Sequence, residues 1–115
     1  RGSVGVRAGT EAATLTPGGW AFCPAGDSLR FGDAVDGTEV VCFRKIFEPL
    51  DGVARPVPLT GNTSAVSGRP FLGNPRALLQ TLLPEDERYD LAMNIFTYQP
   101  GATLPFVETH IMEHG

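Results

Sequence analysis

The chain has 115 residues, of which 42% are hydrophobic and 19% are charged, a balance typical of one soluble globular domain with a modest core. Its formal net charge of −4 weighs against nucleic acid and anionic membranes as partners, because both select basic surfaces. No apolar run is long enough to span a membrane and no signal peptide is visible, so we expect a cytoplasmic protein.

The spacing of glycine and proline indicates the fold class. The 14 glycines and 10 prolines are spread along the chain rather than gathered in tracts, which is typical of many short strands joined by turns. Patterns of a regular helix are almost absent. The sequence therefore predicts an all-β protein.

Residues 11–47 show a β pattern throughout. Turns are expected at Pro17-Gly18-Gly19 and at Asp36-Gly37, the second as a hairpin. Residues 39–47, "EVVCFRKIF", are rich in β-branched and aromatic side chains and predict a central strand. We expect three aromatic side chains of this region in the core: Trp20, Phe22 and Phe43. Arg44 and Lys45 are expected on the surface.

The two cysteines lie within apolar stretches of the same region. Cys23 and Cys42 are therefore expected to be buried free thiols in a reducing compartment. A disulfide between them requires a geometry that spacing along the chain does not supply.

The second half of the chain begins with a change of character. Residues 48–75 are rich in glycine and proline and show no sustained period, which indicates a linker. Residues 76–83, "RALLQTLL", fit either a helix or a strand, because four leucines fall at spacings that both allow. Residues 89–97 alternate in polarity and predict a strand with one face against a core.

Two carboxylates and both histidines of the chain gather in seven residues near its end: Glu108, His110, Glu113 and His114. On a helix, "HIMEH" matches the His-x-x-Glu-His pattern of inverted zinc proteases. The preceding "TLPFVETHI" is rich in β-branched residues and offers no helix cap, so it opposes that reading.

A strand arranges the same side chains differently. Glu108 and His110 then share one face with Cα atoms roughly 6.7 Å apart, while Glu113 points away. His114 lies about 13 Å further along a straight strand, so it joins a common metal site only if the chain bends. Ordinary solvated side chains remain an alternative.

The stretch "PGATLPFVETHIMEHG" resembles the first metal motif of cupins. Pro100-Gly101 opens the motif, Glu108 stands in the first His place, His110 in the second, and His114 in the Glu place. This variant is similar to the (S)-ureidoglycine aminohydrolases, a family of two-cupin enzymes. The resemblance implies a jelly-roll β-barrel in a bicupin architecture.

The first half resembles a degenerate cupin. Gly18 and Pro24-Ala25-Gly26 reproduce the later cupin motif, but Leu29 stands at the place of its metal-binding His. We therefore expect residues 1–47 to be the C-terminal half of a degenerate first cupin. Residues 48–75 would be the inter-domain linker and residues 76–115 the beginning of a metal-binding second cupin, so that the chain is a fragment of a longer protein.

The resemblance implies a hydrolase that releases ammonia from (S)-ureidoglycine to give (S)-ureidoglycolate in ureide and purine catabolism. It implies Glu108, His110 and His114 as ligands of Mn²⁺, although this ligand set also admits other divalent ions. A glutamine beyond residue 115 would complete the site, substrate-binding residues are unknown, and the fragment alone is expected to be inactive. The small ureide is the expected partner, and a homo-oligomer is expected. A non-catalytic metal-dependent cupin and a cupin enzyme of other chemistry remain alternatives.

Overall fold

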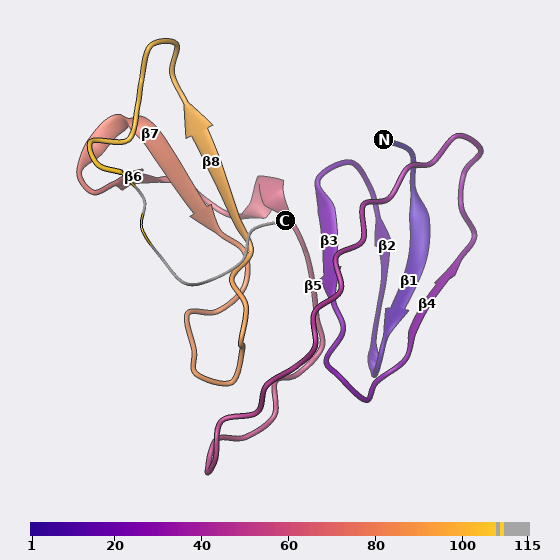
Figure 1. The fold of residues 1–115 in the computed structure, drawn as a ribbon. Helices are drawn as coiled ribbons and strands as arrows, with labels where there is room; N and C mark the ends of the chain where they lie inside the picture. The colour runs from indigo at the N-terminus through magenta and orange to yellow at the C-terminus, as the bar shows by residue number, and fades with distance from the viewer. Residues whose placement is uncertain (108, 110–115) are drawn as a thin grey trace.

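The computed structural model describes residues 1–107 and 109, which form short strands and one three-residue 3-10 helix (Figure 1). The elements are β1 (Val4–Ala8), β2 (Glu11–Leu15), β3 (Gly19–Phe22), β4 (Leu29–Gly32), β5 (Leu59–Asn62), η1 (Thr63–Ala65), β6 (Arg69–Phe71), β7 (Asn74–Thr81) and β8 (Asn94–Tyr98). The prediction of an all-β protein is confirmed. No helix within the described ranges has the length and apolarity needed to cross a bilayer.

The first sheet has the order β2-β1-β4, with antiparallel pairing on both sides of β1. Val4, Val6 and Ala8 of β1 are buried on one face, and the strand alternation places Gly5 and Arg7 on the other. Strand β1 therefore has one face toward the core and one face toward solvent, as is common in antiparallel sheets.

The second sheet joins distant parts of the chain, because β3 pairs with β5 in an antiparallel register. Strand β5 lies within residues 48–75, and it is followed by η1, whose first turn is capped by the Asn62 side chain accepting from the Ser64 N–H. This segment, expected to be a linker, therefore holds regular structure. The division of the chain into two cupin units stays a prediction.

Gly61 of β5 lies directly opposite Trp20 of β3. A Cβ at Gly61 would stand 2.6 Å from a ring carbon of Trp20, closer than carbon atoms approach. We therefore expect Gly61→Ala to destabilise the protein by about 1–3 kcal/mol, measured by urea unfolding. Gly32→Ala is the matched control, because a Cβ at Gly32 meets nothing within 4 Å. Equal stability of the two variants would contradict this close packing.

The third sheet has the order β6-β7-β8 and contains a bulge between Pro70 and Phe71. Residues 76–83, which fitted both helix and strand, lie mostly in β7, where Ala77 and Leu79 are buried. Strand β8 begins only at Asn94, later than the strand expected over 89–97. The Asp86 carbonyl accepts from the Tyr89 N–H, so residues 86–89 form a turn and delay the strand.

The prediction of a central strand over residues 39–47 is wrong. No strand forms there, and Val41, Phe43 and Ile46 are 79%, 72% and 86% exposed. A strand needs a neighbour for its backbone N–H and C=O groups. Here the Glu39 N–H donates to the Arg1 carbonyl at 3.2 Å, but no described strand continues that pairing. The turn at Asp36-Gly37 is confirmed by the Thr38 N–H to Val35 carbonyl bond of 3.0 Å, but it joins no hairpin.

The aromatic and cysteine predictions have mixed outcomes. Trp20 and Phe22 are half-buried, whereas placing Phe43 in the core is wrong for the same lack of a strand partner. Both cysteines are free, as expected. Cys23 is half-buried, and burial together with the nearby Asp27 carboxylate raises the pKa of its thiol. Cys42 is exposed, so its predicted burial is wrong.

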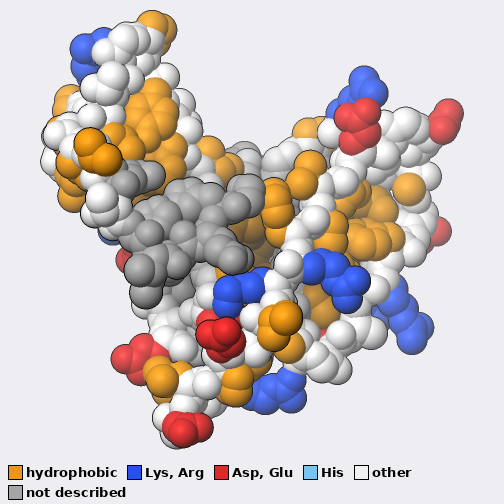
Figure 2. All heavy atoms as spheres, viewed as in Figure 1, with side chains coloured by type: hydrophobic (Ala, Val, Ile, Leu, Met, Phe, Trp, Pro, Cys, Tyr) orange, Lys and Arg blue, Asp and Glu red, His pale blue; other side chains and the backbone are white. Residues whose placement is uncertain are grey.

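The chain exposes more surface than a compact protein of its size. Its accessible surface is 8425 Å², against roughly 6,100 Å² expected for a compact monomer of 12.3 kDa. Its radius of gyration is 15.9 Å, against about 13 Å expected. Apolar side chains gather on open faces of the first and third sheets (Figure 2). Within residues 1–107 and 109, these side chains stay exposed, whereas a closed barrel would cover them with a second layer.

Candidate metal site

The three predicted metal ligands, Glu108, His110 and His114, lie outside the described residues, as does Glu113. Their assignment therefore stays a prediction. Within residues 1–107 and 109, no group of three or more His, Cys, Asp or Glu side chains is placed to hold a metal. The described part of the chain instead shows the turn and the sheet face that precede the predicted ligands.

The turn that opens the predicted motif is fixed by a side chain from another strand. Gly101 has φ +74°, a backbone conformation that favours glycine, and the Ala102 N–H donates to the Gln99 carbonyl at 2.9 Å. The Arg76 guanidinium donates to the Pro100 carbonyl at 2.7 Å, and the Gln99 N–H donates to the Arg76 carbonyl at 2.9 Å. Arg76 thus ties the turn to β7, a role that sequence patterns did not indicate.

Aromatic side chains form a cluster on one face of the β6-β7-β8 sheet: Phe71, Phe96, Tyr98 and Phe106. The rings of Phe71 and Phe96 meet edge to face at 5.0 Å, and those of Phe96 and Tyr98 stack at 6.0 Å. Phe106 lies two residues before Glu108, and its ring centroid is 6.4 Å from that of Phe71. The segment before the predicted ligands is therefore anchored beside an apolar wall.

This aromatic cluster was missed by sequence reasoning, although part of its signal was present. Phe96 and Tyr98 are two residues apart on a strand and so must share a face. The contribution of Phe71 depends on the bulge at Pro70/Phe71, which has no recognisable sequence signal. Phe106 lies in a segment without regular structure, where periodicity places no side chain.

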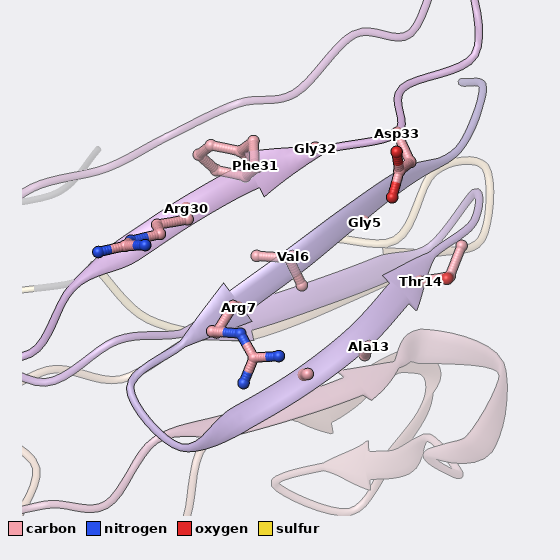
Figure 3. A pocket seen from close by; sticks show the side chains of 10 residues that line it. Gly5, Val6, Arg7, Ala13, Thr14, Arg30, Phe31, Gly32 and Asp33 are labelled. Carbon is pink, nitrogen blue, oxygen red and sulfur yellow. The ribbon is translucent and has the colours of Figure 1, made fainter.

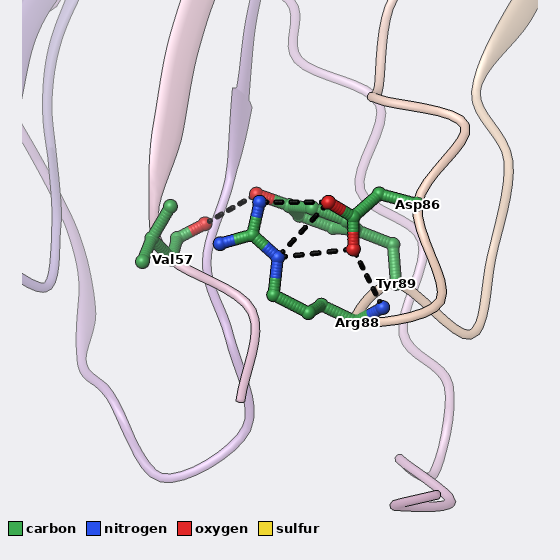
Figure 4. Close-up of polar contacts among 4 residues, drawn as sticks. All are labelled: Val57, Asp86, Arg88 and Tyr89. Carbon is green, nitrogen blue, oxygen red and sulfur yellow. Dashed lines mark hydrogen bonds and ion pairs between the residues drawn. The ribbon is translucent and has the colours of Figure 1, made fainter. Parts of the chain in front are cut away.

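The loop between β7 and β8 contacts the part of the chain that contains β3 and the residues before β5. Tyr89 is buried, contacts the Phe22 ring edge to face at 5.3 Å, and donates its hydroxyl to the Val57 carbonyl at 3.4 Å. Beside it, the Arg88 guanidinium donates to both carboxylate oxygens of Asp86 (Figure 4). This hydrogen bonding lowers the pKa of Asp86 and raises the pKa of Arg88.

A second polar contact joins the same loop, through Asp90, to residues 45–48. Its carboxylate accepts from the Lys45 ammonium at 2.5 Å and from the Glu48 N–H at 2.9 Å. Burial favours the neutral acid, but these hydrogen bonds outweigh it and lower the pKa of Asp90. The expectation that Arg44 and Lys45 lie on the surface is confirmed in that both are exposed, with Lys45 engaged in this ion pair.

The lowered pKa of Asp90 predicts a pH dependence of stability. Its ionised form contributes stability above the unfolded pKa of about 3.9, and that contribution is lost as the pH falls through the lower folded pKa. We therefore expect Asp90→Asn to be less stable than the parent at pH 7, with the difference shrinking as the pH falls below the unfolded pKa. Urea unfolding over a series of pH values measures it. Asp51→Asn, at an exposed turn, is the control, and a difference that stays constant as the pH falls would contradict the link.

The apolar side chain of Leu29 stands where the cupin resemblance would place a metal-binding His, and that assignment stays a prediction. Leu29 begins β4, opposite Ala8 of β1. The preceding turn is formed as expected, because the Asp27 N–H donates to the Pro24 carbonyl at 3.1 Å. The Arg55 guanidinium donates to the Ala25 carbonyl of this turn. Residue 55 is thereby attached to the loop between β3 and β4.

A solved structure matches the chain over most of its length. A Pseudomonas aeruginosa protein, described as glyoxylate-induced, superposes with a TM-score of 0.74 at 24% sequence identity. The match covers 97% of this chain and 43% of that protein. The chain has the cupin fold. It represents the bicupin architecture in part, because it spans less than half of that protein's length.

A curated enzyme is similar over nearly the whole chain. The (S)-ureidoglycine aminohydrolase of Escherichia coli (strain K12) is 29% identical over 115 residues, which cover 99% of this chain and 44% of that enzyme. The resemblance indicated by the residues near position 108 is thereby confirmed over the full chain. No family model matches the sequence. The chain spans less than half the length of this relative.

Proposed function

We propose that the protein containing this chain is a Mn²⁺-dependent hydrolase that releases ammonia from (S)-ureidoglycine and forms (S)-ureidoglycolate, in ureide and purine catabolism. The proposal is carried by the similarity to (S)-ureidoglycine aminohydrolase over 99% of the chain, including the stretch with Glu108, His110 and His114. The similar enzyme is an aminohydrolase, which supports hydrolysis of a C–N bond as the reaction class.

The donor set fits a divalent metal. One carboxylate and two imidazoles, from Glu108, His110 and His114, form a mixed oxygen and nitrogen site of the kind that Mn²⁺ accepts. When bound, the ion supplies Lewis-acid stabilisation of developing charge and a template for the substrate. The three side chains must be deprotonated to act as ligands, so metal affinity is expected to fall at acidic pH.

The described residues support such a site by positioning the segment that precedes the predicted ligands. Arg76 and Gly101 fix the turn from which the segment carrying the ligands departs. The Phe71 ring contacts the ring of Phe106, two residues before Glu108, and so helps to hold the residues that precede the predicted ligands.

The test is an ammonia assay on the full-length protein with (S)-ureidoglycine as substrate. We expect ammonia release that is lost after treatment with EDTA and restored by Mn²⁺. The 115-residue chain assayed alone is expected to be inactive, because its sheets have open faces and edges. Stoichiometric Mn²⁺ binding by the full-length protein without ammonia release would contradict the proposed reaction and favour a non-catalytic cupin.

A further inference from the structure

The solvated face of the first sheet carries two arginines directly opposite each other. Arg7 of β1 pairs with Arg30 of β4 in the antiparallel register, so their Cβ atoms are roughly 5 Å apart on one face. Both side chains are exposed. This face belongs to the β2-β1-β4 sheet, whereas the aromatic cluster lies on the β6-β7-β8 sheet.

Two like charges in this arrangement are unfavourable. Directly opposed like charges on neighbouring strands destabilise an antiparallel pair. The ion pairs found among residues 1–107 and 109 involve Arg1, Arg69, Arg88 and Lys45, and neither Arg7 nor Arg30 takes part. Their repulsion is therefore not balanced by a carboxylate within the described part of the chain.

The two arginines lie at one end of an open trough of about 490 Å³ on this sheet (Figure 3). Small residues on the same strands, Gly5, Ala12 and Gly32, keep the floor of the trough low. Thr14 and Asp33 lie at the opposite end. The trough thus has room for a small molecule beside two forks of guanidinium donors.

We propose that Arg7 and Arg30 form a binding site for a small molecule that carries a carboxylate or phosphate group. Two guanidinium groups offer planar, paired N–H donors that match the oxygens of either anion, and binding one would balance the opposed charges. Asp33 disfavours negative charge at the far end of the trough, so the anionic group of the ligand lies at the arginine end.

The test uses full-length protein treated with EDTA, so that anions cannot bind through a metal. Inorganic phosphate and succinate are titrated separately in a low-chloride buffer and followed by amide chemical shifts. We expect saturable shifts at Gly5 and Gly32, and Arg7→Gln or Arg30→Gln is expected to weaken binding about tenfold. Saturation by only one of the two anions would identify which group the site takes.

Three further variants distinguish specific binding in the trough from nonspecific attraction of anions to surface charge. Arg44→Gln removes an equal charge from an exposed position outside the trough and is expected to change affinity less than about twofold. Gly32→Val fills the trough without changing charge, since a Cβ there meets no atom within 4 Å, and should weaken binding. Asp33→Asn should strengthen it. No saturable shift with either anion, or an equal loss in Arg44→Gln, would overturn the proposal.

Discussion

Glu108→Ala is expected to lower ammonia release from (S)-ureidoglycine by more than about a hundredfold in the full-length protein. Loss of a residue that merely orients a metal ligand costs roughly 10- to 100-fold, and loss of the ligand itself should cost more. Glu108 is the only carboxylate in the proposed set and balances part of the metal's charge. Initial rates at saturating Mn²⁺ measure the effect, with circular dichroism to verify that the variant folds.

Glu113→Ala is the matched control for this prediction. It removes a carboxylate only five residues away, but on the predicted strand Glu113 would point away from the face shared by Glu108 and His110. We expect its rate to stay within about threefold of the parent rate. An active Glu108→Ala variant, or an inactive Glu113→Ala variant, would contradict the strand arrangement of the predicted ligands.

Tyr89→Ala is expected to have the largest effect on folding among the described side chains. Tyr89 is 8% exposed and is the link between the loop before β8, the ring of Phe22 in β3 and the Val57 carbonyl. Removing a buried aromatic ring costs about 3–5 kcal/mol, because its contacts are lost and a cavity remains. The free energy of unfolding in urea measures this loss.

Two controls separate the packing of Tyr89 from its hydrogen bond. Tyr89→Phe keeps the ring and removes only the 3.4 Å hydrogen bond, so it is expected to cost about 1 kcal/mol or less. Tyr98→Ala removes a ring that is 40% exposed and should cost clearly less than Tyr89→Ala. A cost below about 1 kcal/mol for Tyr89→Ala would contradict the claim that Tyr89 joins the loop before β8 to β3 and Val57.

Local patterns predicted the parts of the fold that depend on local interactions. The turns at Pro17-Gly18 and Asp36-Gly37 form because glycine adopts the positive φ that they need, +83° at Gly18 and +74° at Gly37. The alternation over 89–97 identified one buried position correctly, Tyr89, even though regular pairing begins only at Asn94. All-β architecture followed from the same short-range signals.

Features that depend on distant partners were not predictable in this way. Residues 39–47 have strand propensity, but propensity forms no strand unless another segment supplies its hydrogen bonds. The pairing of β3 with β5 joins residues about 40 positions apart, and residues 48–75 carry no period that would indicate it. The links from Arg76 to Pro100 and from Lys45 to Asp90 likewise join distant residues. For the candidate metal site, the sequence motif remains the basis of the residue assignment.

The exposed apolar faces of the sheets are consistent with the chain matching less than half the length of each relative. The chain matches 44% of the curated aminohydrolase and 43% of the solved structure, and its surface exceeds that of a compact protein of equal mass. Among the described residues, Phe31 and Phe96 on these faces are 50% and 38% exposed. Expression of the full-length protein is therefore the appropriate basis for the functional tests.

The metal content of the full-length protein tests the central claim most directly. After incubation with Mn²⁺ and gel filtration, we predict about one Mn²⁺ per chain in the parent protein and in Glu113→Gln. Glu108→Gln and His110→Gln are predicted to retain almost none. Full Mn²⁺ retention by both of these variants, or no Mn²⁺ in the parent protein, would contradict the assignment of Glu108, His110 and His114 as metal ligands.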